Sequence, residues 1–203
     1  MATLKDLRPA LPILIGASLM LSLAMGLRQS LGLFMPPLTK DIGITVSDFT
    51  LAIAVQNLSW GLLQPLAGAY AVRVGYRPLM LGGSLLYLLG LVLLATAQGL
   101  VGVVLGAGLA IGASMACTGS AMAMAVAVRR VSPALRSSVL GMVSAAGSLG
   151  ALLAAPIGQA LSQAHGWRWG LVGFIALALL MVPAAWVAGR VDAYPVPAGG
   201  AAN

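Results

Sequence analysis

Six long apolar stretches, separated by short breaks, occupy almost the whole of this 203-residue chain. A helix that crosses the hydrocarbon core of a bilayer needs about 20 mostly apolar residues. Charged residues make up only 7% of the chain, whereas a soluble domain carries about a quarter. The sequence therefore predicts an all-α membrane protein with six transmembrane helices. The predicted spans are Pro9–Met35, Phe49–Val72, Pro78–Ala97, Leu100–Val128, Leu135–Leu161 and Trp169–Gly189.

The breaks between these stretches are too short to hold a soluble domain, so residues 1–192 are interpreted as one transmembrane domain. Residues 193–203 are rich in Pro, Ala and Gly and are predicted to form a disordered C-terminal tail. The first span is predicted to end at Pro36-Pro37, because proline interrupts a helix. Ser47 or Asp48 is expected to cap the second helix, because a short oxygen-bearing side chain accepts its unpaired N–H groups.

The basic residues are distributed unequally between the two sets of loops. The formal net charge of +7 would by itself suggest nucleic acid or other anionic partners. With the N-terminus inside, however, eight basic residues lie in cytoplasmic segments and two in outer loops, as the positive-inside rule requires. We therefore expect a multi-pass protein with both termini cytoplasmic and no nucleic-acid partner. The cytoplasmic residues are Lys5, Arg8, Arg73, Arg77, Arg129, Arg130, Arg136 and Arg190, and the outer ones are Lys40 and Arg168.

The composition gives no support to an enzyme or to a metal protein. The chain has one histidine, His165, and one cysteine, Cys117, which together cannot form a metal site. No set of nucleophile, base and orienting group is present. We expect no catalytic residue, no bound metal and no cofactor. Cys117 is interpreted as a buried small side chain and His165 as a solvated residue of the outer loop Ser162–Trp167.

Arg28 is the one charged residue predicted to lie well inside a span. Its guanidinium stays charged and offers five donors in a fixed fork that suits a carboxylate. The sequence contains no Glu, and its four Asp residues lie in loops or tails, so no carboxylate in the membrane neutralises Arg28. An intramembrane charge indicates a functional site. The alternative is snorkelling, since Arg28 lies about 12 Å of helix from the predicted outer end of the span.

Several other residues are further candidates for substrate binding. They are Gln29, Gln56, Asn57 and Trp60. The second span places Gln56 and Trp60 on one face, at i and i+4, and Asn57 on the adjoining face. Polar side chains in spans also serve as hydrogen-bond partners between helices, and for these residues both interpretations stay open.

The turn between the second and third spans carries a recognisable motif. The segment Gly68–Arg77 reads GAYAVRVGYR and resembles the pattern Gly-x-x-x-Asp-Arg-x-Gly-x-Arg of major facilitator superfamily transporters, with Val72 in place of the usual Asp. A second segment, Gly26–Phe34, is similar to bacterial members related to the monocarboxylate and oxalate–formate carriers. The resemblance covers nearly the whole chain and implies the N-terminal six-helix half of that fold, built from a 3+3 inverted repeat.

The resemblance also implies roles for the residues of the motif. Gly68, Arg73, Gly75 and Arg77 would form the inner gating turn. In the family the Asp of this motif helps to latch one half of the transporter to the other, so Val72 implies a weaker or rebuilt latch.

The resulting hypothesis is a secondary-active transporter of the bacterial inner (plasma) membrane that carries a small organic anion, a carboxylate, held by Arg28. Transporters of this family have their substrate site between two halves. A parallel homodimer in the lipid bilayer would place a second copy where the other half belongs. The alternative is a non-transporting membrane subunit, or a truncated fragment, that needs a partner half.

Overall fold

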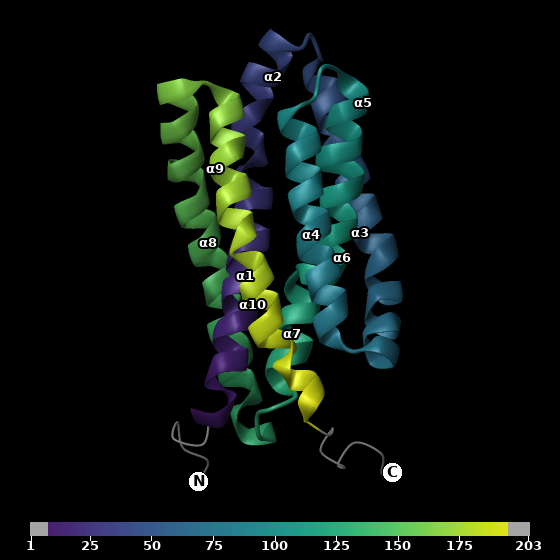
Figure 1. Ribbon diagram of the computed structural model, residues 1–203, viewed down its shortest axis with the longest axis vertical. Coiled ribbons are helices and arrows are strands. Elements are labelled where there is room, and N and C mark those ends of the chain that lie inside the picture. The colour runs from purple at the N-terminus through teal and green to yellow at the C-terminus, as the bar shows by residue number, and fades with distance from the viewer. Residues whose placement is uncertain (1–7, 195–203) are drawn as a thin grey trace.

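The structure is a computed structural model that describes residues 8–194, and within this range all regular elements are helical (Figure 1). The chain forms α1 (Leu11–Gln29), η2 (Ser30–Phe34), α2 (Met35–Asp41), α3 (Val46–Val74), α4 (Tyr76–Ala95), α5 (Leu100–Val103), η3 (Val104–Ala110), α6 (Ile111–Thr118), α7 (Ser120–Val128), η4 (Pro133–Leu135), α8 (Arg136–His165), α9 (Trp167–Leu179), α10 (Met181–Ala188) and η5 (Gly189–Ala193).

Within residues 8–194, five helical stretches are long and apolar enough to cross a membrane: Arg8–Asp41, Tyr76–Ala95, Leu100–Val128, Pro133–His165 and Trp167–Ala193. The 29-residue α3 is absent from this set, since Gln56, Asn57 and Gln64 make it more polar. Its length nevertheless corresponds to about 43 Å of helix. The all-helical membrane architecture is thus confirmed, while a count of six spans stays a prediction.

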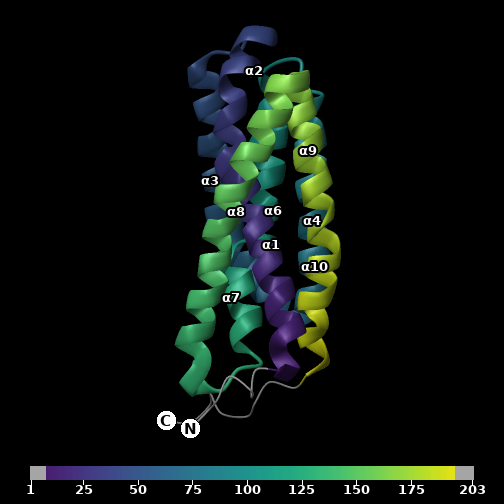
Figure 2. The same ribbon diagram turned by 90° about the vertical axis from the view of Figure 1, so that its left-hand side faces the viewer.

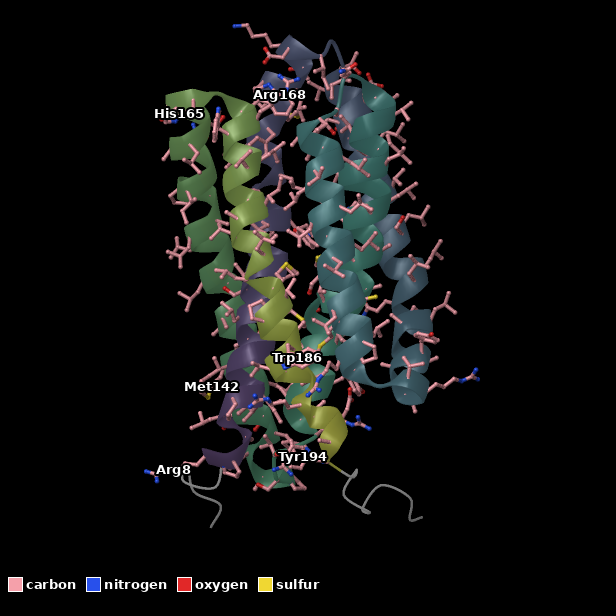
Figure 3. All side chains as sticks on the ribbon, viewed as in Figure 1. Arg8, Met142, His165, Arg168, Trp186 and Tyr194 are labelled. Atoms are coloured by element: carbon pink, nitrogen blue, oxygen red, sulfur yellow. The ribbon has the colours of Figure 1, made fainter. Side chains whose placement is uncertain are left out.

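The long helices run side by side in an elongated bundle (Figures 1 and 2). Helix α1 packs against α8 and α10, α3 packs against η3 and α6, and α4 lies against both α6 and α9. Arg8 and Tyr194 lie at one end of the bundle, called the base below, and His165 and Arg168 lie at the opposite end, called the top (Figure 3). The part of the predicted tail from 195 onward lies outside the described residues, and Ala193 still belongs to η5.

The first helical stretch continues through Pro36-Pro37, so the predicted stop at these prolines is wrong. The chain tightens into the 3-10 segment η2 and then resumes as α2, in which the prolines occupy the first turn. The first turn of a helix tolerates proline because its N–H groups have no intrahelical partner there. Lys40 and Asp41, expected in a loop, therefore end a helix.

The cap of α3 is also different from the prediction. Thr45 is the N-cap, and its hydroxyl accepts the backbone N–H of Asp48 at 3.1 Å. The Asp48 carboxylate in turn accepts the backbone N–H of Thr45 at 2.8 Å. This reciprocal pair is a capping box, in which Asp48 is the third helical residue rather than the cap.

The stretch Leu100–Val128 is interrupted twice. Its segment η3 has π-helical hydrogen bonding, and Gly119 takes up an extended conformation between α6 and α7. Small residues in this stretch allow close packing: a Cβ at Gly112 would lie 2.6 Å from the carbonyl oxygen of Gln56. The α3 backbone therefore approaches α6 more closely than any larger residue would permit, as is typical of small-residue motifs in membranes.

Candidate functional site

Arg28 lies near the end of α1 and reaches across to α3. Its Nη2 donates a hydrogen bond to Oδ1 of Asn57, and its Cζ lies 5.0 Å from the centroid of the Trp60 ring. Asn57 and Trp60 are one helical turn apart, so they present an amide and an aromatic face to the same guanidinium. The Nδ2 of Asn57 donates to the Ile53 carbonyl at 2.9 Å, which fixes the orientation of its Oδ1. We call Arg28, Asn57 and Trp60 the arginine cluster.

The arginine cluster contains a charge that the described residues do not neutralise. The carboxylates of Asp41, Asp48 and Asp192 accept hydrogen bonds elsewhere, from Trp167, Thr45 and Tyr76 respectively. The Nε of Arg28 is buried and has no hydrogen-bond partner among residues 8–194. An unpaired N–H of a half-buried guanidinium is a costly feature, and an oxyanion would satisfy it.

The geometry also bears on the snorkelling alternative. Because the helical stretch extends to Asp41, Arg28 lies roughly 13 residues, or about 20 Å, from its top end. Its guanidinium is held by Asn57 and Trp60 instead of extending freely toward that end. These contacts hold the guanidinium against α3, and the internal site stays a prediction.

Gln56 is separated from the arginine cluster although it is the neighbour of Asn57 in sequence. Its side chain is 1% exposed, and its Nε2 donates to the Ala107 carbonyl at 2.6 Å. Ala107 belongs to η3, where π-type pairing alters the usual pattern of carbonyl partners. In this structure Gln56 joins two helices, which corresponds to the packing interpretation of its amide.

Gln29 is exposed and lies apart from the arginine cluster, although it follows Arg28 directly in the chain. It lines a small cavity of about 140 Å³ between α1, α7 and α8. Three serines line this cavity with it. They are Ser120, Ser144 and Ser148.

The turn between α3 and α4 depends on Gly75, whose φ is +97°. Glycine alone adopts this backbone region without strain, and a Cβ here would lie 2.7 Å from Oδ2 of Asp192. The Asp192 carboxylate accepts the backbone N–H groups of Tyr76 at 2.9 Å and Arg77 at 2.7 Å. It therefore caps α4 from the far end of the chain.

The other residues of the predicted gating turn point in different directions. The guanidinium of Arg77 lies over Trp186 of α10, with its Cζ 4.7 Å from the ring centroid. Arg73 is exposed and faces a groove between helices, and Gly68 has open space where a Cβ would be. Val72, at the position of the family Asp, is 74% exposed. Arg77 thus joins the turn to α10, and Gly75 leaves room for Asp192 of η5.

Sequence reasoning missed the role of Asp192, which it placed only among the aspartates in loops or tails. No local pattern reveals a cap that is more than 100 residues distant along the chain. It also missed the hydrogen bond from Nε1 of Trp167 to the Asp41 carboxylate, at 2.7 Å. That bond ties the start of α9 to the end of α2. His165, expected in a loop, is the exposed last residue of α8.

Comparison with known proteins gives consistent matches. A family model described as Major Facilitator Superfamily matches residues 17–202. Monocarboxylate transporter 11 of Mus musculus is 33% identical over 168 residues, which cover 79% of this chain and 36% of the relative. The protein of the same name from Homo sapiens is also 33% identical over 168 residues, which cover 34% of its length.

A further relative, monocarboxylate transporter 3 of Mus musculus, is 28% identical over 158 residues, which cover 77% of this chain and 31% of the relative. The chain thus spans about a third of the length of these curated relatives. The family match extends from the first helical stretch to beyond the last described residue.

Proposed function

Because the chain belongs to the Major Facilitator Superfamily, a family of multi-pass membrane transporters, we propose that it takes part in secondary active transport of a small organic anion. The observation that carries this proposal is the arginine cluster, in which Arg28 contacts Asn57 and Trp60 and, among residues 8–194, has no carboxylate beside it. The three reported relatives are named as monocarboxylate transporters, and a carboxylate is the ligand that a guanidinium fork suits.

Arg28 binds the carboxylate, and its neighbours hold it in place for that task. Asn57 accepts one N–H of the guanidinium, and Trp60 covers the cation with its ring. Both contacts leave further N–H groups for the substrate. Since no described carboxylate neutralises Arg28, the loaded carrier is closer to neutrality than the empty one. The carrier therefore exchanges anions or moves a proton together with its weak-acid substrate.

A second copy of the chain completes the transport pathway. The helices α3 and α8 have few buried residues. Their outer faces carry large apolar side chains, including Leu58, Leu62 and Leu152, each more than 60% exposed. A parallel homodimer covers these faces and encloses the arginine cluster between two copies, with a two-fold axis along the membrane normal.

We further propose that the protein lies in the bacterial inner membrane with both termini in the cytoplasm. Arg8 and Tyr194 lie at the same end of the bundle (Figure 3). The base also carries Arg129, Arg130 and Arg190, near the ends of α7 and α10. The excess of basic residues at this end supports its assignment to the cytoplasmic side.

The test is uptake of labelled carboxylates, monocarboxylates and oxalate included, into proteoliposomes that contain only this chain. We expect saturable uptake by the unmodified protein and loss of uptake in Arg28→Ala. Arg28→Lys keeps the charge without the planar fork, and this variant should retain a small part of the uptake. Arg168→Ala is the matched control, because it removes an exposed arginine at the top, stacked on Trp167, and should leave uptake unchanged.

The oligomeric state is measured in the same vesicles. A Leu62→Cys variant on a Cys117→Ser background places one thiol on the exposed face of α3, and we expect crosslinking between copies. If folded protein transports none of the carboxylates and stays monomeric, the proposal fails, and the chain acts as a non-transporting subunit or fragment that needs a partner half.

A further inference from the structure

An apolar groove runs between α3 and α4 on the half of the bundle that leads to the base. Its larger part has a volume of about 550 Å³ and a smaller adjoining part about 370 Å³. Tyr70, Leu79, Leu86 and Cys117 line both parts, so the two form one continuous groove. Leu63 and Ala113 line the larger part only. We call this feature the α3–α4 groove.

The groove exists because α3 is packed along only part of its length. Near its start, the Gln56 carbonyl lies so close to Gly112 that a Cβ could not be accommodated. Farther along α3, a Cβ at Gly61 or Gly68 would meet no atom within 4 Å. Pro65 lies between these glycines and removes a backbone hydrogen bond, which permits the helix to bend.

The walls of the groove are apolar, and the one charged residue that lines it within residues 8–194 stands near the base. That residue is Arg73, which is exposed in the last turn of α3, and Figure 1 shows the α3–α4 turn toward the base. The nearby carboxylate of Asp192 is occupied by the backbone N–H groups of α4, and Arg77 stacks on Trp186. Arg73 is therefore available to an anionic group at the mouth of the groove.

We propose that the α3–α4 groove binds an anionic phospholipid of the bilayer, with an acyl chain between α3 and α4 and its phosphate on Arg73. The chemistry of the groove matches the two parts of such a lipid, because hydrocarbon lines its length and a guanidinium stands at one end. A basic residue at the headgroup level attracts anionic lipids. The volume also lies in the range of ligand pockets. The bound lipid supports the part of α3 that the protein leaves unpacked. This site is distinct from the arginine cluster and does not depend on the transport proposal.

Native mass spectrometry of the purified full chain, given equal amounts of phosphatidylglycerol and phosphatidylcholine, measures the headgroup preference. We expect the unmodified protein to retain phosphatidylglycerol in preference to phosphatidylcholine. In Arg73→Gln this preference should fall about fivefold, because one basic residue near a lipid surface contributes about 1 kcal/mol. Arg190→Gln is the control, because it removes another exposed arginine, in η5, and should keep the preference. An equal loss in both variants would show a general effect of basic charge and would overturn the assignment to Arg73.

The position of the acyl chain is tested separately. A phosphatidylglycerol with a photoreactive group in its chain should label peptides that contain Leu63, Ala113 or Cys117. Ala113→Leu, which fills the larger part of the groove, should reduce that labelling without changing the labelling of the exposed α8 face. Labelling spread evenly over α3 and α8 would show that no lipid occupies the groove and would overturn the proposal.

Discussion

The carboxylate of Asp192 accepts the backbone N–H of Arg77 at 2.7 Å, although the two residues are 115 positions apart in the chain. Its other oxygen accepts the N–H of Tyr76 at 2.9 Å. These N–H groups open α4 and have no intrahelical partner. The start of α4 is therefore completed by η5, and the stacking of Arg77 on Trp186 joins α4 to α10, which leads into η5. The turn is fixed within the six-helix unit itself, at the place where Val72 replaces the family's Asp.

Replacing Asp192 should destabilise the protein through the loss of this cap. We expect Asp192→Ala to lower the free energy of unfolding by about 1 kcal/mol, the usual value of an N-cap. Asp192→Asn should lower the free energy of unfolding by less, because its amide oxygen still accepts one N–H. Thermal unfolding in detergent measures both. Arg190→Ala, an exposed neighbour in η5, is the control, and an equal loss there would show that the cap is not the cause.

The capping box of α3 should make stability depend on pH. The backbone and side-chain hydrogen bonds of Thr45 hold the pKa of the Asp48 carboxyl below its ordinary value of 3.8. A depressed folded-state pKa means that the stabilisation is complete above the unfolded-state pKa and is lost as the pH falls through the folded-state pKa. Asp48→Asn should therefore be less stable than the unmodified protein at pH 7, with the difference disappearing in strong acid. A difference that persists unchanged at low pH would contradict this origin.

Gln56 should contribute to stability and not to substrate binding. Its amide donates to the Ala107 carbonyl from a side chain that is 1% exposed, and hydrogen bonds between membrane helices contribute about 0.6 kcal/mol on average. We expect Gln56→Leu to lower the melting temperature modestly while the KM for the transported anion stays unchanged. A raised KM with an unchanged melting temperature would place Gln56 in the substrate pathway.

The membrane class, five of the apolar helical stretches and the family could be predicted from the sequence, because long apolar runs and the Gly68–Arg77 motif are local patterns. The prolines at Pro36-Pro37 misled the prediction of a helix end, since sequence does not reveal that a 3-10 segment places them in a first turn. Thr45 was missed as the cap because Ser47 and Asp48 are equally good capping residues by type.

The site was predictable only in part, for a physical reason. Arg28 stands out because any charge in a span is conspicuous. Whether Asn57 or Gln56 joins it depends on the rotation of α3, which is set by its packing on η3 and α6 through Gly112. The two residues are adjacent in sequence, yet one contacts Arg28 and the other Ala107. Asp192 has no local signal because its partners are distant in the chain.

In the arginine cluster, adding a negative charge at position 57 should reduce uptake more than removing the side-chain contact does. Asn57 accepts a hydrogen bond from Arg28 through a neutral oxygen, so the cation remains available to a substrate anion. Asn57→Asp has nearly the same shape but places a carboxylate at that position, where it forms an ion pair with the guanidinium and competes with the substrate. We therefore expect Asn57→Asp to reduce uptake of carboxylates at pH 7 more than Asn57→Leu, which removes the contact without neutralising the charge. The pH dependence of uptake tests the same idea.

Uptake by Asn57→Asp should recover partly at lower pH, as the new carboxyl becomes protonated. The measurement is the initial rate of carboxylate uptake into proteoliposomes for both variants, at pH 7 and at lower pH. Arg168→Ala is the unaffected control. Equal uptake by the two variants at pH 7 would mean that Asn57 acts by packing alone and that Arg28 does not bind the anion through the atoms that face Asn57.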